Sequence, residues 1–117
     1  MEDNIAIEAL SALAQPTRLQ AFRLLVKHEP EGLAAGDLAR FCDAPANTMS
    51  THLAILARAR LIESERRGRT IIYRANIATV RDLVLYLVRD CCGGDASLCA
   101  PLIAGLTPCC DKAPDIA

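Results

Sequence analysis

The sequence has little aromatic material and no long apolar run. Its 117 residues include no tryptophan, and only 3% are aromatic. It has no stretch of about eighteen consecutive apolar residues, the length that a membrane-spanning helix needs. The acidic start Met1-Glu2-Asp3-Asn4 lacks the basic and then apolar pattern of a secretion signal. We therefore expect no membrane partner and a cytoplasmic location.

The side-chain arrangements of common enzymes are missing as well. There are only two histidines, and neither a Ser/His/Asp set nor a pair of catalytic carboxylates can be recognised. Gly93-Gly94 lacks the flanking residues of a phosphate loop, and no Cys-x-x-Cys motif begins a helix. We expect neither catalytic activity nor a catalytic cofactor.

Enough apolar material is present for one folded domain, because 52% of the residues are hydrophobic and 23% are charged. The formal net charge is only −1, yet the charge is unevenly distributed. The segment 51–75 holds two glutamates and six arginines: Arg58, Arg60, Arg66, Arg67, Arg69 and Arg74. The remainder holds seven basic and twelve acidic residues. One localised basic segment favours a localised anionic partner.

Apolar periodicity predicts a mainly helical fold. Helical spacing runs from about residue 5 to 27 and is broken at Pro16, which removes a backbone donor and pushes Gln15 away from helical geometry. A short helix is expected over 36–42, with Leu38, Phe41 and Cys42 directed inward. A final helix is expected over 77–90, ended by Gly93-Gly94.

A longer helix is expected over about 47–59, followed by a β-hairpin. Asn47 and Thr48 are its expected capping residues, and its buried stripe is expected to contain Met49, Leu53, Ile55 and Leu56. Strands are expected over 61–66 and 70–75, with Arg67-Gly68 as the tight turn between them. The sequence therefore predicts a helix-turn-helix at about 36–59 and an antiparallel wing at about 61–75.

This order of elements suits the reading of double-stranded DNA. A helix with short polar side chains can enter the major groove, and a ribbon tipped with arginines can reach the adjacent phosphates. The candidates on the helix are Asn47, Thr48, Ser50, Thr51 and His52. The candidates on the ribbon are Arg66, Arg67 and Arg69. The alternative is that this helix face is merely solvated and that the arginines only confer solubility.

Three motifs resemble the ArsR/SmtB family of winged-helix repressors. The segment 9–19, ALSALAQPTRL, resembles the family's LxDPTRL opening, and 47–56, NTMSTHLAIL, resembles its recognition helix. Arg67-Gly68-Arg69 and Tyr73-Arg74 resemble its wing. The resemblance covers about residues 5–90 and implies a winged helix-turn-helix homodimer, built through the first and last helices, that binds an operator and releases it when an inducer binds. Arg60 departs from the family, which usually has glycine there, and we expect this non-glycine residue to hold a strained left-handed backbone.

The family members differ in where the inducer binds, and two of their sites are missing from this sequence. The enteric arsenical site has three cysteines in the helix before the recognition helix, where this chain has only Cys42. The zinc site uses histidines on the last helix, where this chain has none. Cys42 is expected to be a small hydrophobic residue and not a ligand.

The remaining candidate site is the cysteine group at the end of the last helix. Cys91, Cys92 and Cys99 offer three soft thiolates, the number that trivalent arsenic or antimony prefers. A continuous helix would separate Cys92 from Cys99 by about 10.5 Å, but Gly93-Gly94 allows the chain to fold back. The arrangement also resembles a C-terminal three-cysteine arsenite site of some family members. We expect As(III) as inducer, with Sb(III) or a methylated arsenical as further candidates.

Other assignments of the thiols stay open. Cys109 and Cys110 could form a second site, could bind a monosubstituted arsenical through two sulfurs, or could have no function. A repressor of the same fold could instead respond to cadmium, lead or zinc, or to oxidation of its thiols. We expect residues 1–92 to form the DNA-binding and dimerisation domain and residues 93–117 to form a cysteine-containing tail.

Overall fold

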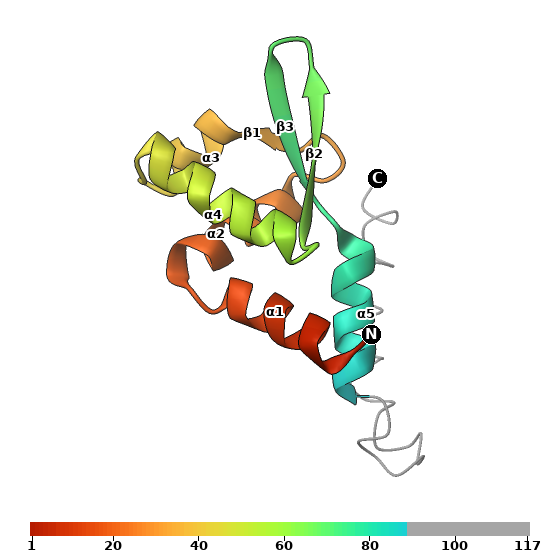
Figure 1. The fold of residues 1–117 in the computed structure, drawn as a ribbon. Coiled ribbons are helices and arrows are strands. Elements are labelled where there is room, and N and C mark those ends of the chain that lie inside the picture. The colour runs from red at the N-terminus through yellow and green to blue at the C-terminus, as the bar shows by residue number, and fades with distance from the viewer. Residues whose placement is uncertain (89–117) are drawn as a thin grey trace. The chain divides into compact units, whose positions relative to one another are not determined.

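Pro16 separates two helices at the start of the chain, as the sequence predicts. In the computed structural model, which describes residues 1–88, α1 spans Asp3–Leu13 and α2 spans Pro16–Lys27 (Figure 1). Gln15 is extended, and its side-chain oxygen accepts a hydrogen bond of 2.8 Å from the backbone N–H of Arg18. Proline suits the first position of α2 because that position needs no intrahelical donor.

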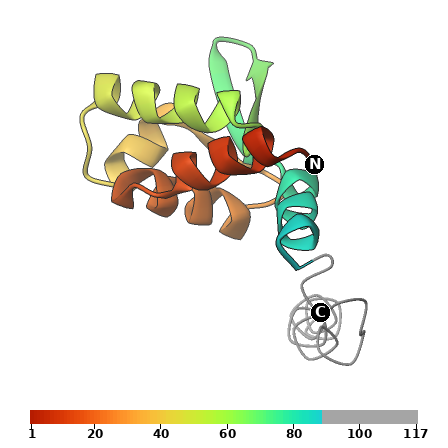
Figure 2. The same cartoon turned by 60° about the horizontal axis from the view of Figure 1, so that its bottom comes forward.

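The predicted helix-turn-helix consists of α3 (Ala35–Phe41) and α4 (Ala46–Arg58). The expected capping of the second helix is wrong, because its N-cap residue is Pro45, which has no side-chain hydrogen bond to offer. The Asn47 side chain instead accepts a 2.9 Å hydrogen bond from the N–H of Thr48 inside the first turn. Figure 2 shows α4 lying alongside α1 and α2, with which it is in contact.

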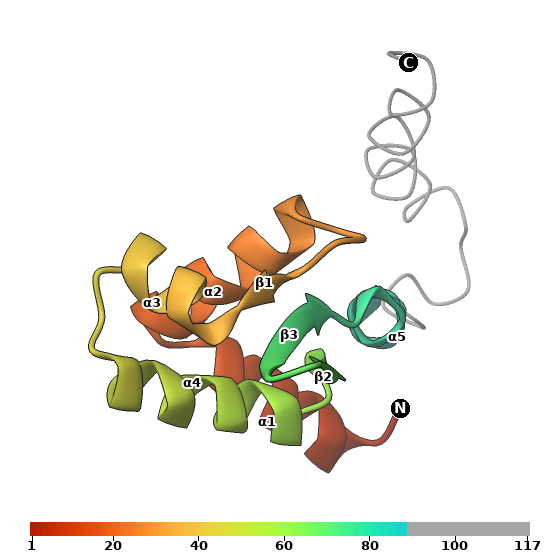
Figure 3. The ribbon, with the colours of Figure 1, turned by 90° about the horizontal axis from the view of Figure 1, so that it is seen from above.

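The wing is part of a three-stranded antiparallel sheet. Its strands are β1 (Leu33–Ala34), β2 (Ile62–Arg67) and β3 (Thr70–Ala75), in the order β1-β3-β2 (Figure 3). Arg67 pairs with Thr70, so the turn is formed by Gly68 and Arg69 and not by Arg67-Gly68 as expected. Gly68 has a φ of +65°, which glycine adopts without strain. β1 has only two residues, too few to show an alternating pattern in the sequence.

The last described helix, α5, spans Ile77–Val88. Residues Met1–Leu83 form one compact unit, and only the end of α5 is described from the second unit, Val84–Ala117. The domain boundary expected at 92/93 lies outside the described residues. No helix of the described part of the chain is both long enough and apolar enough to cross a bilayer.

The core lies between the helices and the base of the hairpin. Its largest fully buried side chains are Leu25, Leu38, Met49, Leu53, Leu56 and Leu61. Two expectations were wrong: Ile55 is only half-buried, and Phe41 is 50% exposed. Phe41 lies at the last position of α3, where its ring stacks on His28 at 6.4 Å between centroids and lies 5.6 Å from the Arg40 guanidinium. These surface contacts replace burial.

Arg60 has a left-handed backbone, with a φ of +67°, as expected from the glycine that the family usually has at this position. A non-glycine residue in this region is strained by about 1 to 2 kcal/mol. Arg60→Gly should therefore stabilise the fold by up to about 1 kcal/mol, after allowance for the entropy that glycine adds to the unfolded chain. Thermal unfolding at a fixed protein concentration would show a rise of a few degrees.

Asp43 supplies the matched control for this substitution. Its φ is +51°, but aspartate tolerates the left-handed region because its short side chain can bond locally. Asp43→Gly should thus give a smaller gain than Arg60→Gly. An equal or larger gain at Asp43 would contradict the assignment of strain to Arg60.

Candidate nucleic-acid interface

The polar face of α4 is available to a partner over its first two turns. Burial of Met49, Leu53 and Leu56 on one side of the helix leaves the opposite side in solvent. Asn47, Thr48, Ser50 and Thr51 are exposed, and His52 is half-buried. The hydroxyl of Thr51 donates a 3.2 Å hydrogen bond to the carbonyl of Asn47, which fixes its oxygen as an acceptor. The structure thus brings together all five helix candidates named from the sequence.

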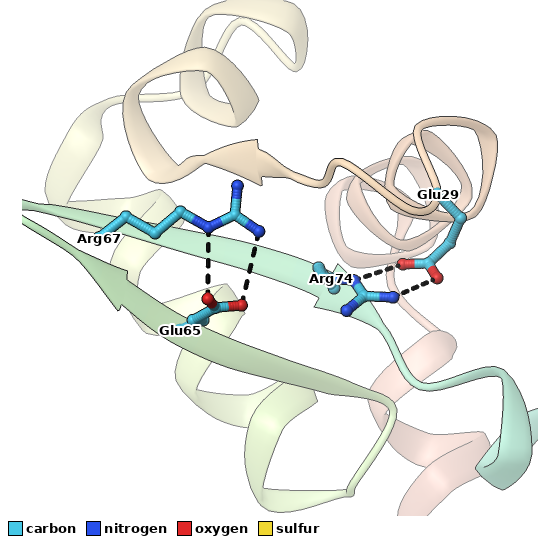
Figure 4. A network of polar contacts seen from close by, with 4 residues as sticks. All are labelled: Glu29, Glu65, Arg67 and Arg74. Atoms are coloured by element: carbon cyan, nitrogen blue, oxygen red, sulfur yellow. Dashed lines mark hydrogen bonds and ion pairs between the residues drawn. The ribbon is translucent and has the colours of Figure 1, made fainter.

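The three candidate arginines of the wing lie at its tip. Arg66 and Arg67 are the last residues of β2, Arg69 lies in the turn, and all three are exposed. Figure 4 shows Arg67 directed at Glu65, whose oxygens lie 3.4 and 3.5 Å from its Nε and Nη2 atoms. Both side chains are more than half exposed, so this pair contributes little to stability. Arg66 and Arg69 have no ion pair within residues 1–88.

Arg74 belongs to the basic segment in the sequence but not to the free positive charge of the wing. Its Nε and Nη2 atoms donate hydrogen bonds of 3.2 and 3.0 Å to the two carboxylate oxygens of Glu29 (Figure 4). This hydrogen-bonded pairing raises the pKa of the Arg74 guanidinium above its usual value. The pair fastens β3 to the loop after α2. Because the partners are 45 positions apart, no local sequence pattern could reveal it.

Arg18 is a second arginine that the sequence does not mark as part of the interface. Its Nε atom donates a 2.6 Å hydrogen bond to the carbonyl of Ala12 at the end of α1. Its Nη1 atom lies 3.4 Å from Nδ1 of His52 on α4. One side chain therefore joins the α1–α2 junction to the candidate reading helix.

Cys42 is the one cysteine within the described part of the chain. It is buried at the end of α3, and desolvation by burial raises the pKa of its thiol. This agrees with a packing role, because the reactive form of cysteine is the thiolate. No group of three or more His, Cys, Asp or Glu side chains within residues 1–88 is placed to hold a metal ion. Cys91, Cys92, Cys99, Cys109 and Cys110 lie outside the described residues.

Comparison with known proteins assigns the fold to a family. The profile of a helix-turn-helix domain matches residues 13–65. The chain is 30% identical over 87 residues to the transcriptional repressor SdpR of Bacillus subtilis, a match that covers 74% of this chain and 93% of that protein. A homodimeric winged helix-turn-helix DNA-binding domain from Mycobacterium bovis, a possible ArsR-family regulator, matches with 25% identity and a TM-score of 0.62, over 75% of this chain and 85% of that one. The chain belongs to the ArsR/SmtB family of transcriptional regulators.

Further relatives of this ArsR/SmtB-family chain carry different descriptions. It is 37% identical over 81 residues to the HTH-type transcriptional regulator KmtR of Mycobacterium tuberculosis, a match that covers 69% of this chain but only 60% of KmtR. A crystal structure described as a possible transcriptional regulator for arsenical resistance matches with 29% identity and a TM-score of 0.58, over 71% of this chain and 86% of that one. The protein is therefore a DNA-binding transcriptional regulator and not an enzyme.

Proposed function

We propose that this ArsR/SmtB-family protein represses transcription as a homodimer and leaves its operator when trivalent arsenic binds Cys91, Cys92 and Cys99. The observation that carries the inducer assignment is the group of three thiols within the nine residues 91–99, which follow α5 in the sequence. Two of them are adjacent, and Gly93-Gly94 separates them from the third. The relative described as a possible regulator for arsenical resistance supports the same assignment.

The proposed DNA contacts divide into base reading and backbone positioning. Asn47, Thr48, Ser50 and Thr51 offer short donors and acceptors in exposed positions on α4, and the half-buried His52 follows them, which suits contacts with base edges in the major groove. Arg66, Arg67 and Arg69 at the tip of the wing suit phosphate oxygens, which hold a protein in register without reading the sequence.

Exposed aliphatic side chains support the proposed homodimer. α1 buries the alanines Ala6, Ala9 and Ala12, whereas its larger residues Ile7 and Leu10 are 65% and 42% exposed. α5 likewise leaves Leu85 and Leu87 about half exposed. Apolar residues concentrated on an outer helix face favour burial against a protein partner. A second copy of the chain is the partner that we propose. The related DNA-binding domain from Mycobacterium bovis is itself described as homodimeric.

Thiolate chemistry favours a trivalent metalloid as the inducer. Arsenic(III) forms a pyramid with three sulfurs, which matches the number of thiols in this group, whereas a structural zinc site usually takes four ligands. Sb(III) is the second candidate because its bonding is similar. Cys109 and Cys110 are candidates to bind a monomethylated arsenical, in which one methyl group leaves only two positions for sulfur. Ligand binding next to α5 would change the dimer seam, and a coupling of a few kcal/mol would suffice to vacate the operator.

An arsenite titration of the reduced protein tests this proposal. The probe is a fluorescent duplex that the protein selects from a random pool, and release is followed by anisotropy. We expect arsenite to release the wild-type protein, and we expect Cys91→Ser, Cys92→Ser and Cys99→Ser to bind DNA normally without responding. Cys42→Ala is the matched control, because it removes a buried thiol outside the proposed site and should leave the response intact.

Parallel titrations separate the proposed inducer from its alternatives. Release by Cd²⁺, Pb²⁺ or Zn²⁺ but not by arsenite would assign the thiols to a divalent metal. Release by peroxide alone would identify a thiol-redox regulator, since the vicinal thiols could form a disulfide with Cys99. Either result would overturn the arsenical assignment and leave DNA binding in place.

A further inference from the structure

Arg18 occupies a fixed position at the start of α2. It is the third residue of the helix, and the side chain of Gln15 accepts the hydrogen bond from its backbone N–H. Its Nε atom donates to the carbonyl of Ala12, which lies in the last turn of α1. A cation is favourable at this place, because the final carbonyls of a helix lack intrahelical donors and carry the negative end of the helix dipole. Arg18 therefore belongs to α2, and its guanidinium is hydrogen-bonded to the end of α1 and also contacts His52.

The contact with Arg18 orients the imidazole ring of His52. A guanidinium has donors only, so Nδ1 of His52, at 3.4 Å, must act as the acceptor. A neutral imidazole that accepts at Nδ1 carries its proton on Nε2. Within residues 1–88 no further hydrogen bond to this ring is present, so the Nε2–H donor is left for an external acceptor.

We propose that Arg18 is a positioning residue for DNA recognition, acting through the half-buried His52 on α4. Arg18 holds the ring so that Nε2–H faces an acceptor on the duplex, either a phosphate oxygen or the N7 or O6 atom of guanine. The inference rests on the proposed function, because it requires that the His52 face of α4 meets DNA. It adds a link between the α1–α2 junction and the reading helix that involves no contact of Arg18 with DNA.

A double-mutant cycle on operator affinity tests this link. We expect His52→Ala to weaken binding by about tenfold and Arg18→Ala by a similar factor, which is the size of one lost hydrogen bond at each half of a dimer. The double variant should bind no more weakly than His52→Ala alone, because Arg18 has no effect once the ring is gone. Additive losses would overturn the proposal and would indicate that Arg18 acts on the fold or on the overall charge.

Two conservative variants distinguish positioning from charge and from folding. Arg18→Lys keeps the charge but cannot reach Ala12 and His52 with two separate nitrogens, so it should lose affinity nearly as Arg18→Ala does. His52→Gln can accept from Arg18 and donate to DNA, so it should stay within a few-fold of the wild type. Wild-type affinity of Arg18→Lys would contradict the positioning role. Thermal unfolding of each variant separates a loss of affinity from a loss of fold.

Failure of this inference and failure of the proposed function give different results. If His52→Ala binds the operator as the wild type does, the assignment of this helix face to DNA is wrong. If His52→Ala loses affinity but Arg18→Ala does not, only the positioning role is wrong. A relaxed preference at one base pair in His52→Ala would identify guanine as the acceptor, whereas a loss of affinity that is uniform across operator sequences would identify a phosphate.

Discussion

Replacing Arg66 and Arg69 together by alanine should weaken operator binding roughly a hundredfold at about 0.1 M salt. Both side chains are exposed at the tip of the wing, and neither has an ion pair within residues 1–88. In a homodimer the double substitution removes four cations. Because each neutralised phosphate contributes about 0.9 to the slope of log K against log salt, the slope should decrease by about 3 to 4.

Glu65 and Arg67 provide the controls on the same hairpin. Arg67 is already paired with Glu65 in the free protein, so Arg67→Ala should cost less affinity than the loss of either Arg66 or Arg69. Glu65→Gln should strengthen binding a few-fold, because it frees Arg67 and removes a negative charge close to the phosphates. Fluorescence anisotropy at several salt concentrations gives both the affinity and the slope. A double variant of Arg66 and Arg69 with an unchanged slope would show that the wing does not touch the phosphates.

Local rules account for the elements that the sequence predicts correctly. Pro16 ends one helix and begins the next, and the strand-forming residues 70–75 coincide with β3. Both features depend on the conformational preferences of a few neighbouring residues, which are present in any short window of sequence. The left-handed backbone at Arg60 was expected for another reason, the resemblance to a family that usually has glycine there.

Contacts between distant residues account for what the sequence does not reveal. β1 exists because Leu33 and Ala34 pair with Tyr73 and Ile72, not because two residues have strand character. The exposure of Phe41 depends on the ring of His28, which comes from another element. The link between Arg18 and His52 spans 34 positions. In each case the partner becomes a neighbour only through folding, so the interface is predictable in its residue types but not in its supporting contacts.

Among the glycines in the described part of the chain, Gly32 is the one whose replacement by alanine should destabilise the fold most. Gly32 has a φ of +77°, where an alanine is strained by about 1 to 2 kcal/mol. Its added Cβ would also collide with the backbone carbonyl oxygen of Tyr73 and lie 2.8 Å from side-chain carbons of Ile72 and Arg74. The carbonyl belongs to β3, which is paired on both sides and cannot move aside freely. We expect a total loss of about 3 kcal/mol or more, which lowers Tm by roughly 10 to 20 °C.

Gly36→Ala is the matched control, because the same chemical change there meets neither obstacle. Gly36 lies in α3, and a Cβ added to it would have nothing within 4 Å. Alanine is favoured over glycine in a helix by about 0.5 to 1 kcal/mol, so this variant should be at least as stable as the wild type. Thermal unfolding of both variants at one protein concentration makes the comparison. Equal Tm values for Gly32→Ala and Gly36→Ala would show that the loop at Gly32 can move away from β3. The close approach of the Gly32 backbone to the Tyr73 carbonyl would then contribute nothing to the position of the wing.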